Sequence, residues 1–342
     1  MINKIMKSFL MIFLLLSVFT VNAQEVSKTG TTAAKFLNIL VGPRAIGMGA
    51  AYAAVANDPY SMYWNPAGIA DIDKYKAAFS YTKVFADVKL NYVAAVIPAG
   101  EFGSIGFNVT ALFMNDMEVT TENYPEGTGE LFSAGSFALG LSYARNITTN
   151  FSAGINIKYI RENIYNSSAN GFAFDVGTKF LTPFWDVMFA SSITNVGTKM
   201  QMSGDDLLIR HDQDPTRNGN NETIDANYKT DEFDLPLRLQ VGLSKEFELL
   251  EGQKVTVAVD AIHPNDNDQW VNTGIEFSLF DNLLALRAGY KTLFLKDSQE
   301  GLTLGFGLAY DKFGNIGIAV DYAYQKYEYL EDIHSFGICL SF

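Results

Sequence analysis

The chain has 342 residues, with 38 acidic against 25 basic side chains and a formal net charge of −13 at pH 7. This balance argues against nucleic acid as a partner, because phosphates need a basic face. The single cysteine, Cys339, excludes an intrachain disulfide. No linker rich in proline, glycine or serine divides the sequence, so we expect one large domain.

Residues 1–23 have the pattern of a secretory signal peptide. Lys4 and Lys7 form a basic region, residues 9–19 are apolar, and residues 21–23 offer small side chains for cleavage. The apolar run is too short for a helix that spans a membrane. The mature protein should begin near Gln24.

Residues 24–74 are expected to form a short helix followed by a compact plug. Glycine and proline concentrate between residues 42 and 70, where they favour tight turns and bar the chain from the middle of a sheet. The alanines at 50–56 can pass through a confined space. The residues assigned to this plug or gating motif are Gly42, Arg44, Gly47, Gly49, Asn57, Asp58, Trp64, Asn65, Pro66, Ala67 and Gly68.

Residues 75–342 alternate between apolar and small or polar side chains with the period of a strand. In residues 104–113, for example, Ile105, Phe107 and Val109 oppose Ser104, Gly106 and Asn108. The pattern predicts fourteen strands, near 75–83, 89–97, 103–114, 131–145, 150–162, 169–180, 186–195, 235–246, 253–262, 270–279, 283–292, 301–311, 313–325 and 333–342.

The character of the two strand faces separates a membrane barrel from a soluble sandwich. A sandwich needs large side chains to fill its core. Here the second face is mostly Gly, Ser, Thr and Asn, which suits a wet or plugged lumen, while the apolar face suits lipid. The charged members of the second face are Lys158, Arg238, Asp260, Arg287 and Asp321. We therefore expect an all-β fold, a membrane-spanning, antiparallel, up-and-down barrel of about 14 strands.

The lengths of the connections support this barrel. Those after even-numbered strands are short, whereas those after odd-numbered strands include 115–130 and 196–234. This parity places both termini in the periplasm and the barrel in an outer membrane, in contact with its lipids. The last strand ends in Phe342 and resembles the signal read by the barrel assembly machinery, an expected partner.

The segment 196–234 is the least barrel-like part of the sequence. Asp212, Asp214 and Asn218 faintly resemble a calcium loop, but their spacing favours a solvated loop, so no metal site is assigned. Apolar residues near its start suit adaptable recognition of a partner protein. These candidate docking residues are Met200, Met202, Leu207, Leu208 and Ile209.

Enzyme signatures are absent from the sequence, and no cofactor or catalytic residue is expected. His211, His263 and His334 are far apart in the chain. A barrel hydrolase built on His263 and a serine from a neighbouring strand is a minor alternative that lacks an orienting third group.

Three motifs together carry a family resemblance. Residues 42–52 (GPRAIGMGAAY), 56–58 (AND) and 64–68 (WNPAG) resemble the N-terminal signature of the PorV/PorQ family, within the wider FadL-like group of outer-membrane barrels. Residues 260–266 and 287–290 extend the resemblance, and so do residues 321–324.

The resemblance implies a fourteen-stranded barrel whose N-terminal segment plugs the periplasmic side. FadL-like proteins carry the Asn-Pro-Ala segment in that plug and release hydrophobic molecules sideways into the membrane. PorV-like proteins instead serve type IX secretion and receive cargo through their outer loops. Two functions therefore stay open: association with secretion components or secreted cargo, and transport of a hydrophobic ligand. Met62, Tyr63 and Trp64 could line an apolar patch for such a ligand or seal the plug against the wall.

Overall fold

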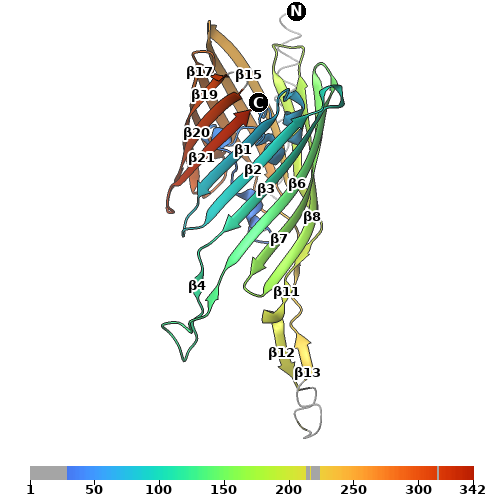
Figure 1. Ribbon diagram of the computed structural model, residues 1–342, viewed down its shortest axis with the longest axis vertical. Helices are drawn as coiled ribbons and strands as arrows, with labels where there is room; N and C mark the ends of the chain where they lie inside the picture. The colour runs from blue at the N-terminus through green and yellow to red at the C-terminus, as the bar shows by residue number, and fades with distance from the viewer. Residues whose placement is uncertain (1–28, 213–215, 217–223, 314–315) are drawn as a thin grey trace, which may run out of the picture.

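Fourteen antiparallel strands close into a barrel (Figure 1), as the alternation predicts. The computed structural model describes residues 29–212, 216, 224–313 and 316–342, so the predicted signal peptide lies outside the described residues. Each strand pairs with its neighbours in the chain, and the first strand pairs with the last. The barrel strands are β1 (Lys76–Lys83), β2 (Lys89–Pro98), β3 (Ser104–Phe113), β6 (Ala134–Thr148), β7 (Phe151–Ile164), β8 (Ser167–Leu181), β9 (Met188–Gly197), β15 (Arg238–Leu250), β16 (Gln253–Pro264), β17 (Trp270–Leu279), β18 (Leu284–Leu293), β19 (Glu300–Phe313), β20 (Ile316–Tyr327) and β21 (Ile333–Ser341).

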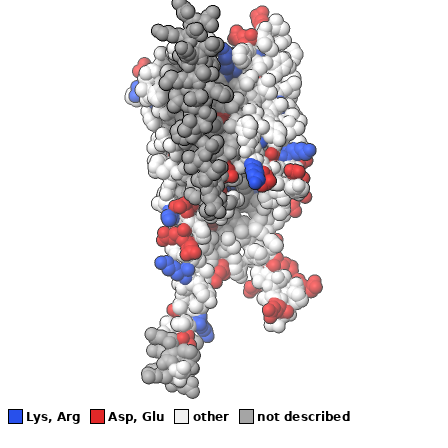
Figure 2. Space-filling view, turned by 180° about the vertical axis from the view of Figure 1, so that it is seen from behind, with Lys and Arg blue, Asp and Glu red and all other residues white. Residues whose placement is uncertain are grey.

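The register of the strands separates an apolar outer face from a small, polar inner face. Phe107 of β3 lies opposite Leu141 of β6, and both are about half exposed on the outside. The next pair, Asn108 and Gly140, faces the lumen. Where Figure 2 leaves the barrel wall uncovered, most of its side chains are uncharged. This is the arrangement that a lipid-embedded barrel requires.

The two ends of the barrel differ in the length of their connections. At the end that holds Phe342, called here the turn end, connections such as 149–150 and 251–252 are short. At the opposite loop end, residues 114–133 and the described parts of the connection between β9 and β15 project from the barrel (Figure 1). The expected segregation of short and long connections is therefore present.

The long connections carry short strands of their own. They form β4 (Met117–Glu118) with β5 (Leu131–Phe132), β10 (Met200–Gln201) with β14 (Glu232–Phe233), and β12 (Leu208–His211) with β13 (Ile224–Asn227). The two-residue strand β11 (Ser203–Gly204) pairs with β8, and the 3-10 turn η4 (Asp205–Leu207) follows it. A further 3-10 turn, η3 (Gly100–Phe102), lies between β2 and β3 at the turn end.

Residues 29–75, called here the inner segment, lie within the ring of strands (Figure 1). The segment contains η1 (Lys35–Asn38), α2 (Pro43–Gly47), α3 (Ser61–Trp64) and η2 (Pro66–Asp71). Helix α2 packs against β18–β21, whereas η2 packs against β3 and β6–β8. The helix expected ahead of Gly42 is reduced to the single turn η1, because left-handed Ala34 and extended Ile39 bound it.

The inner segment runs the length of the lumen. Near its start Thr32 pairs with Asp234 at the base of the longest loop, and near its end Asp71 contacts Lys179 at the turn end. Its large side chains are fully buried, with Met48, Tyr52, Met62 and Trp64 at most 1% exposed. Small wall residues leave room for them, since a Cβ added to Gly106 would meet the Met62 sulfur at 2.3 Å. In the described part of the chain, no helix is both long and apolar enough to cross a bilayer.

The outward face yields a depth-dependent prediction. Leu141 lies midway along β6 and Ile147 near its turn end, and both point outward. Leu141→Arg should lower the free energy of unfolding in lipid vesicles by about 2–4 kcal/mol, and Ile147→Arg by only about 0–1 kcal/mol, because arginine is costly at the bilayer centre. Equilibrium denaturant titration followed by tryptophan fluorescence measures both. Equal costs at the two positions would contradict the assigned membrane depth.

Candidate functional site

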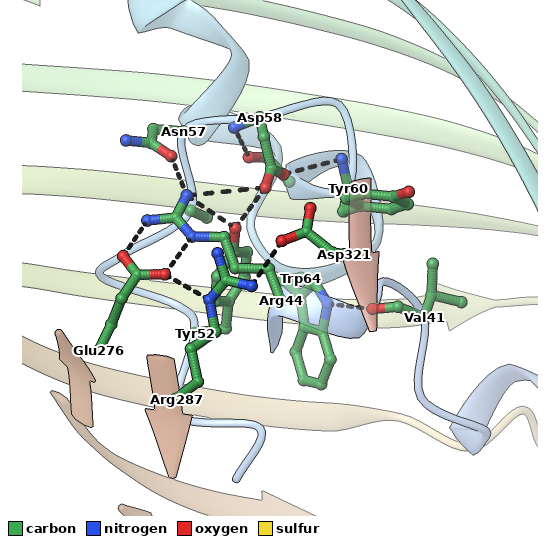
Figure 3. Close-up of polar contacts among 12 residues, drawn as sticks. Val41, Arg44, Tyr52, Asn57, Asp58, Tyr60, Trp64, Glu276, Arg287 and Asp321 are labelled. Atoms are coloured by element: carbon green, nitrogen blue, oxygen red, sulfur yellow. Dashed lines mark hydrogen bonds and ion pairs between the residues drawn. The ribbon is translucent and has the colours of Figure 1, made fainter. Parts of the chain in front are cut away.

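The main polar cluster joins the inner segment to the barrel wall through Arg44 (Figure 3). The turn at Gly42, with φ of 85°, and Pro43 at the helix start aim the Arg44 side chain toward β17. There its Nε donates to Glu276 Oε2 at 2.9 Å and its Nη2 to Oε1 at 2.8 Å. This two-point contact fixes both the distance and the orientation of α2 relative to the wall.

Glu276 is shared between two arginines. Arg287 of β18 donates from Nε to Glu276 at 2.6 Å and from Nη1 to Asp321 of β20 at 2.5 Å. The row Arg44–Glu276–Arg287–Asp321 therefore alternates in charge and is neutral as a whole (Figure 3). Because the Glu276 side chain is only 5% exposed, removing one partner would leave a largely buried charge without its counter-charge.

Asn57 and Asp58 fold back onto the same arginine. Arg44 Nη1 donates to Asn57 Oδ1 at 2.7 Å, and the Asp58 carboxylate lies 3.8 Å from Nη1. The Tyr52 hydroxyl donates to Asp58. Burial raises the pKa of the Tyr52 phenol, and Asp58 raises it further, so the phenol stays protonated and remains a donor. Hydrogen bonds and an ion pair thus connect four residues of the inner segment: Arg44, Tyr52, Asn57 and Asp58.

Asp260 of β16 holds the next turn of the inner segment. Its Oδ2 accepts hydrogen bonds from the backbone N–H groups of Tyr52 and Ala53 at 2.7 and 2.8 Å, and from Gln240 at 2.6 Å. Gly49 precedes this turn with φ of 65°, and a Cβ there would lie 2.5 Å from the Thr273 carbonyl. The chain therefore needs glycine at this point, where backbone meets wall backbone.

The Asn-Pro-Ala-Gly turn is anchored to the opposite wall. Asn65 accepts from Ala67 N at 3.1 Å and donates to the carbonyls of Ala53 and Thr178 at 3.0 and 3.1 Å. Pro66 opens η2, where its missing N–H is harmless. A Cβ on Gly68 would lie 2.5 Å from the Ala56 carbonyl, so the turn has room for glycine alone.

Trp64 is sealed between the inner segment and the wall. Its Nε1 donates to the Val41 carbonyl at 2.9 Å, and the Arg238 guanidinium lies 5.3 Å from its ring centroid and 5.4 Å from that of Tyr63. Met62 packs beneath, where Asn156 donates to its carbonyl at 3.3 Å. These contacts favour sealing over an open apolar patch.

Inner cavities remain around the segment in the described part of the chain. One of about 340 Å³ at the turn end is lined by charged groups that include Arg44, Asp58 and Glu276. Two others, of about 200 and 160 Å³, lie toward the loop end and share Leu40, Lys291 and Glu300 among their lining residues. The cavity of about 200 Å³ also has apolar lining residues, among them Ile46, Val84 and Phe85, so it could hold a small hydrophobic molecule.

The predicted docking residues separate into two groups. Met200 is 1% exposed and packs with Phe36, Leu37 and Leu235 in the mouth of the barrel, so it is unavailable to a partner. Met202 packs against the same cluster. Leu208 is 49% exposed at the start of β12, next to half-buried Leu207 and Ile209. The base of the long loop therefore helps to close the mouth of the barrel, whereas Leu208 on β12 is accessible to a partner.

Two further sequence hypotheses concern a calcium site and a barrel hydrolase. The calcium-like stretch with Asp214 and Asn218 lies outside the described residues, and among those described no group of three or more acidic, histidine or cysteine side chains is placed to hold a metal. His263 points outward from β16 opposite Leu239, and in the described part of the chain no serine hydrogen-bonds to it.

Sequence reasoning did not single out Glu276 or Gln240, which complete the cluster. Both occupy inward positions of their strands, in step with Asn272 and Arg238. The available signal was a charged or amide side chain on a strand face whose other residues are small. This signal indicated Asp260, Arg287 and Asp321, but not their partners Glu276 and Gln240.

Part of the chain matches a known protein family. Residues 22–181, 160 of the 342, match the family described as "Type IX secretion system protein PorV". Over these residues the chain is similar to PorV. The match covers the inner segment and β1–β8, and it supports the resemblance carried by the motifs between residues 42 and 68.

Several solved structures share the fold of this chain at low sequence identity. A FadL homologue from Pseudomonas aeruginosa has a TM-score of 0.53 and 12% identity, covering 88% of this chain and 98% of its own. The CymD monoaromatic hydrocarbon channel gives 0.54 and 14%, with 88% and 97% covered. The Ralstonia pickettii toluene transporter TbuX gives 0.53 and 12%, with 88% and 97% covered. A search of curated proteins gives no match.

A substitution at Glu276 tests how much the main polar cluster stabilises the barrel. Glu276→Gln should lower the free energy of unfolding by about 3–5 kcal/mol, because it leaves Arg44 and Arg287 short of a buried counter-charge. The matched control is Glu246→Gln, which breaks an exposed 2.7 Å pair with Lys254 and should cost about 0–1 kcal/mol. Denaturant titration in vesicles measures both variants. Similar costs would contradict the proposed role of Glu276.

Proposed function

We propose that this protein is an outer-membrane barrel of the PorV/PorQ type that serves type IX protein secretion by docking a secretion component or secreted cargo at its loop end. The observation that carries the proposal is the β12–β13 hairpin, which projects beyond the barrel (Figure 1) while the inner segment occupies the lumen. The family match over residues 22–181 supports the same system.

The hairpin has the features of an unfinished interface. Each of its strands has four residues, and among the described residues β12 and β13 pair only with each other. An isolated two-stranded hairpin is marginally stable in water. Leu208, Ile224 and Tyr228 on and beside it are 49%, 41% and 64% exposed. A partner that covers these side chains or extends a free edge would stabilise it.

The second projecting loop contributes charge. Residues 114–133 contain five acidic side chains and no basic one, and Figure 2 shows them gathered on a separate projection. Such a field attracts a basic partner and raises its association rate. The proposed partner face is therefore basic, with apolar side chains near its centre.

The inner segment is proposed to act as the plug of this barrel. Residues 1–23 would direct export, residues 24–74 would form the plug, and residues 75–342 the membrane domain. Arg44 and Asp58 with Glu276 would hold the plug at one wall, and Asn65 at the other. The terminal strand β21, which pairs with β1, would be handed to the assembly machinery.

A second candidate function is transport of hydrophobic molecules. The cavity of about 200 Å³ near Ile46 and Phe85 favours it, and the solved barrels of the same fold include a monoaromatic hydrocarbon channel and a toluene transporter. Transport would require the plug to move, since Trp64 and Met62 are fully buried along the lumen.

The hairpin provides the test of the secretion role. Leu208→Ser combined with Ile224→Ser should reduce cargo export severalfold while barrel assembly stays normal, because the variant removes apolar contact area without touching the wall. The control, Leu249→Ser with Leu250→Ser, changes equally exposed leucines at the turn end and should leave export unchanged. Export is measured as cargo in the medium, and unaffected export in the hairpin variant would contradict the proposal.

The plug provides the test of the transport role. Asn65→Ala removes the hydrogen bonds that tie the turn to Ala53 and Thr178, so under the transport hypothesis toluene flux into proteoliposomes should rise severalfold. Asn170→Ala, which removes an amide on the outside of the barrel, is the control. Flux at the wild-type level in both variants would exclude gating by the plug.

A further inference from the structure

A groove of about 320 Å³ lies on the outward face of the wall, where β15, β16 and β17 run side by side. Ala261 forms its floor, between its ladder neighbours Val241 and Val271. Leu239 and Phe294 bound it. Since a small residue replaces the large ones that cover most of the wall, the surface is recessed here.

The lip of the groove is held in an unusual backbone conformation. Phe294 is 88% exposed with φ of 70°, and Thr292 has φ of 57°. The register of β17 against β18 shifts between Val271 and Thr273 at the same level. Left-handed backbone is unfavourable for both residue types, and such conformations gather at ligand clamps. Here they keep an aromatic ring standing beside the recess.

The two ends of the groove differ in polarity. Val241 and Ala261 lie deeper in the wall, whereas His263 and Gln269 line the end nearer to the loops. Trp270 pairs with Ile262, whose side chain faces the lumen, and both residues also line an inner cavity. The polar end of the groove is therefore formed by His263 and Gln269.

The surrounding backbone excludes an added strand as the occupant. The ladders from Leu239 to His263 and from Ala261 to Val271 are continuous, so no free edge is available there. The hydrocarbon region of the membrane contains acyl chains that can fill the groove. The ester carbonyls at the polar ends of these chains are hydrogen-bond acceptors.

We propose that this groove holds one acyl chain of an outer-leaflet lipid. The chain lies over Ala261 beneath Phe294, and its ester end lies beside His263 and Gln269. The site is independent of the plug and of the docking hairpin, because it opens to the membrane and uses none of their residues.

Photolabelling of the full-length protein tests this site. The probe is phosphatidylglycerol with a diazirine in one acyl chain, mixed into phospholipid vesicles that hold the reconstituted protein. Peptides that contain residues 239–241, 261–263, 269–271 or 294 should be labelled severalfold more than outward-facing peptides of β6 and β7. Ala261→Trp fills the floor and should abolish this preference.

The matched control is Ala288→Trp, which adds the same ring to another outward-facing alanine, opposite Ile275 and Leu304, and should keep the preference. If Ala261→Trp fails to fold, Phe294→Ala is read in its place and should reduce groove labelling. Uniform labelling around the wall would overturn the proposal. So would equal labelling in the two tryptophan variants, or labelling by a diazirine fatty acid but not by the lipid.

Discussion

The contact between Arg44 and Glu276 is the constraint on which the interior of this barrel depends. Glu276, Arg287 and Asp321 of the wall leave one buried negative charge without a counter-charge, and such a charge is costly. Arg44 supplies the missing positive charge from the inner segment and binds the carboxylate at two points. The strands thereby provide a site that only a chain entering the lumen can complete.

Once Arg44 is in place, the rest of the inner segment follows from close packing. Glycine lets backbone approach backbone, as at Gly49 of the inner segment beside Thr273 of the wall, and the amide of Asn65 fixes the far side to β8. Between these two anchors Met48, Met62 and Trp64 fill the remaining space. Because the inner segment occupies the lumen, the surfaces that a partner can reach lie at the loop end and on the lipid face. The proposed function therefore depends on the projecting hairpin and not on a pore.

The fold could be predicted from the sequence because membrane strands must alternate over their whole length. Residues such as Phe107 and Asn108 report opposite faces directly, and all fourteen predicted strands are present. The interior was less accessible to such reasoning. Glu276 is one acidic residue among many until the register sets it beside Arg44, a contact between residues 232 positions apart. Met200 has the composition of a docking residue, yet it is buried because Phe36 and Leu37 lie beneath it, which no local pattern reveals.

The central claim is that a closed, plugged barrel works by binding a partner at its loop end. Affinity purification of the full-length protein from detergent-solubilised outer membranes, with mass spectrometry of proteins and lipids, tests it most directly. Near-stoichiometric recovery of secretion-machinery components or of the C-terminal domains of secreted cargo is expected if the loop end docks a partner. Recovery of the barrel alone, with an apolar small molecule bound in its lumen, would contradict it and would favour transport.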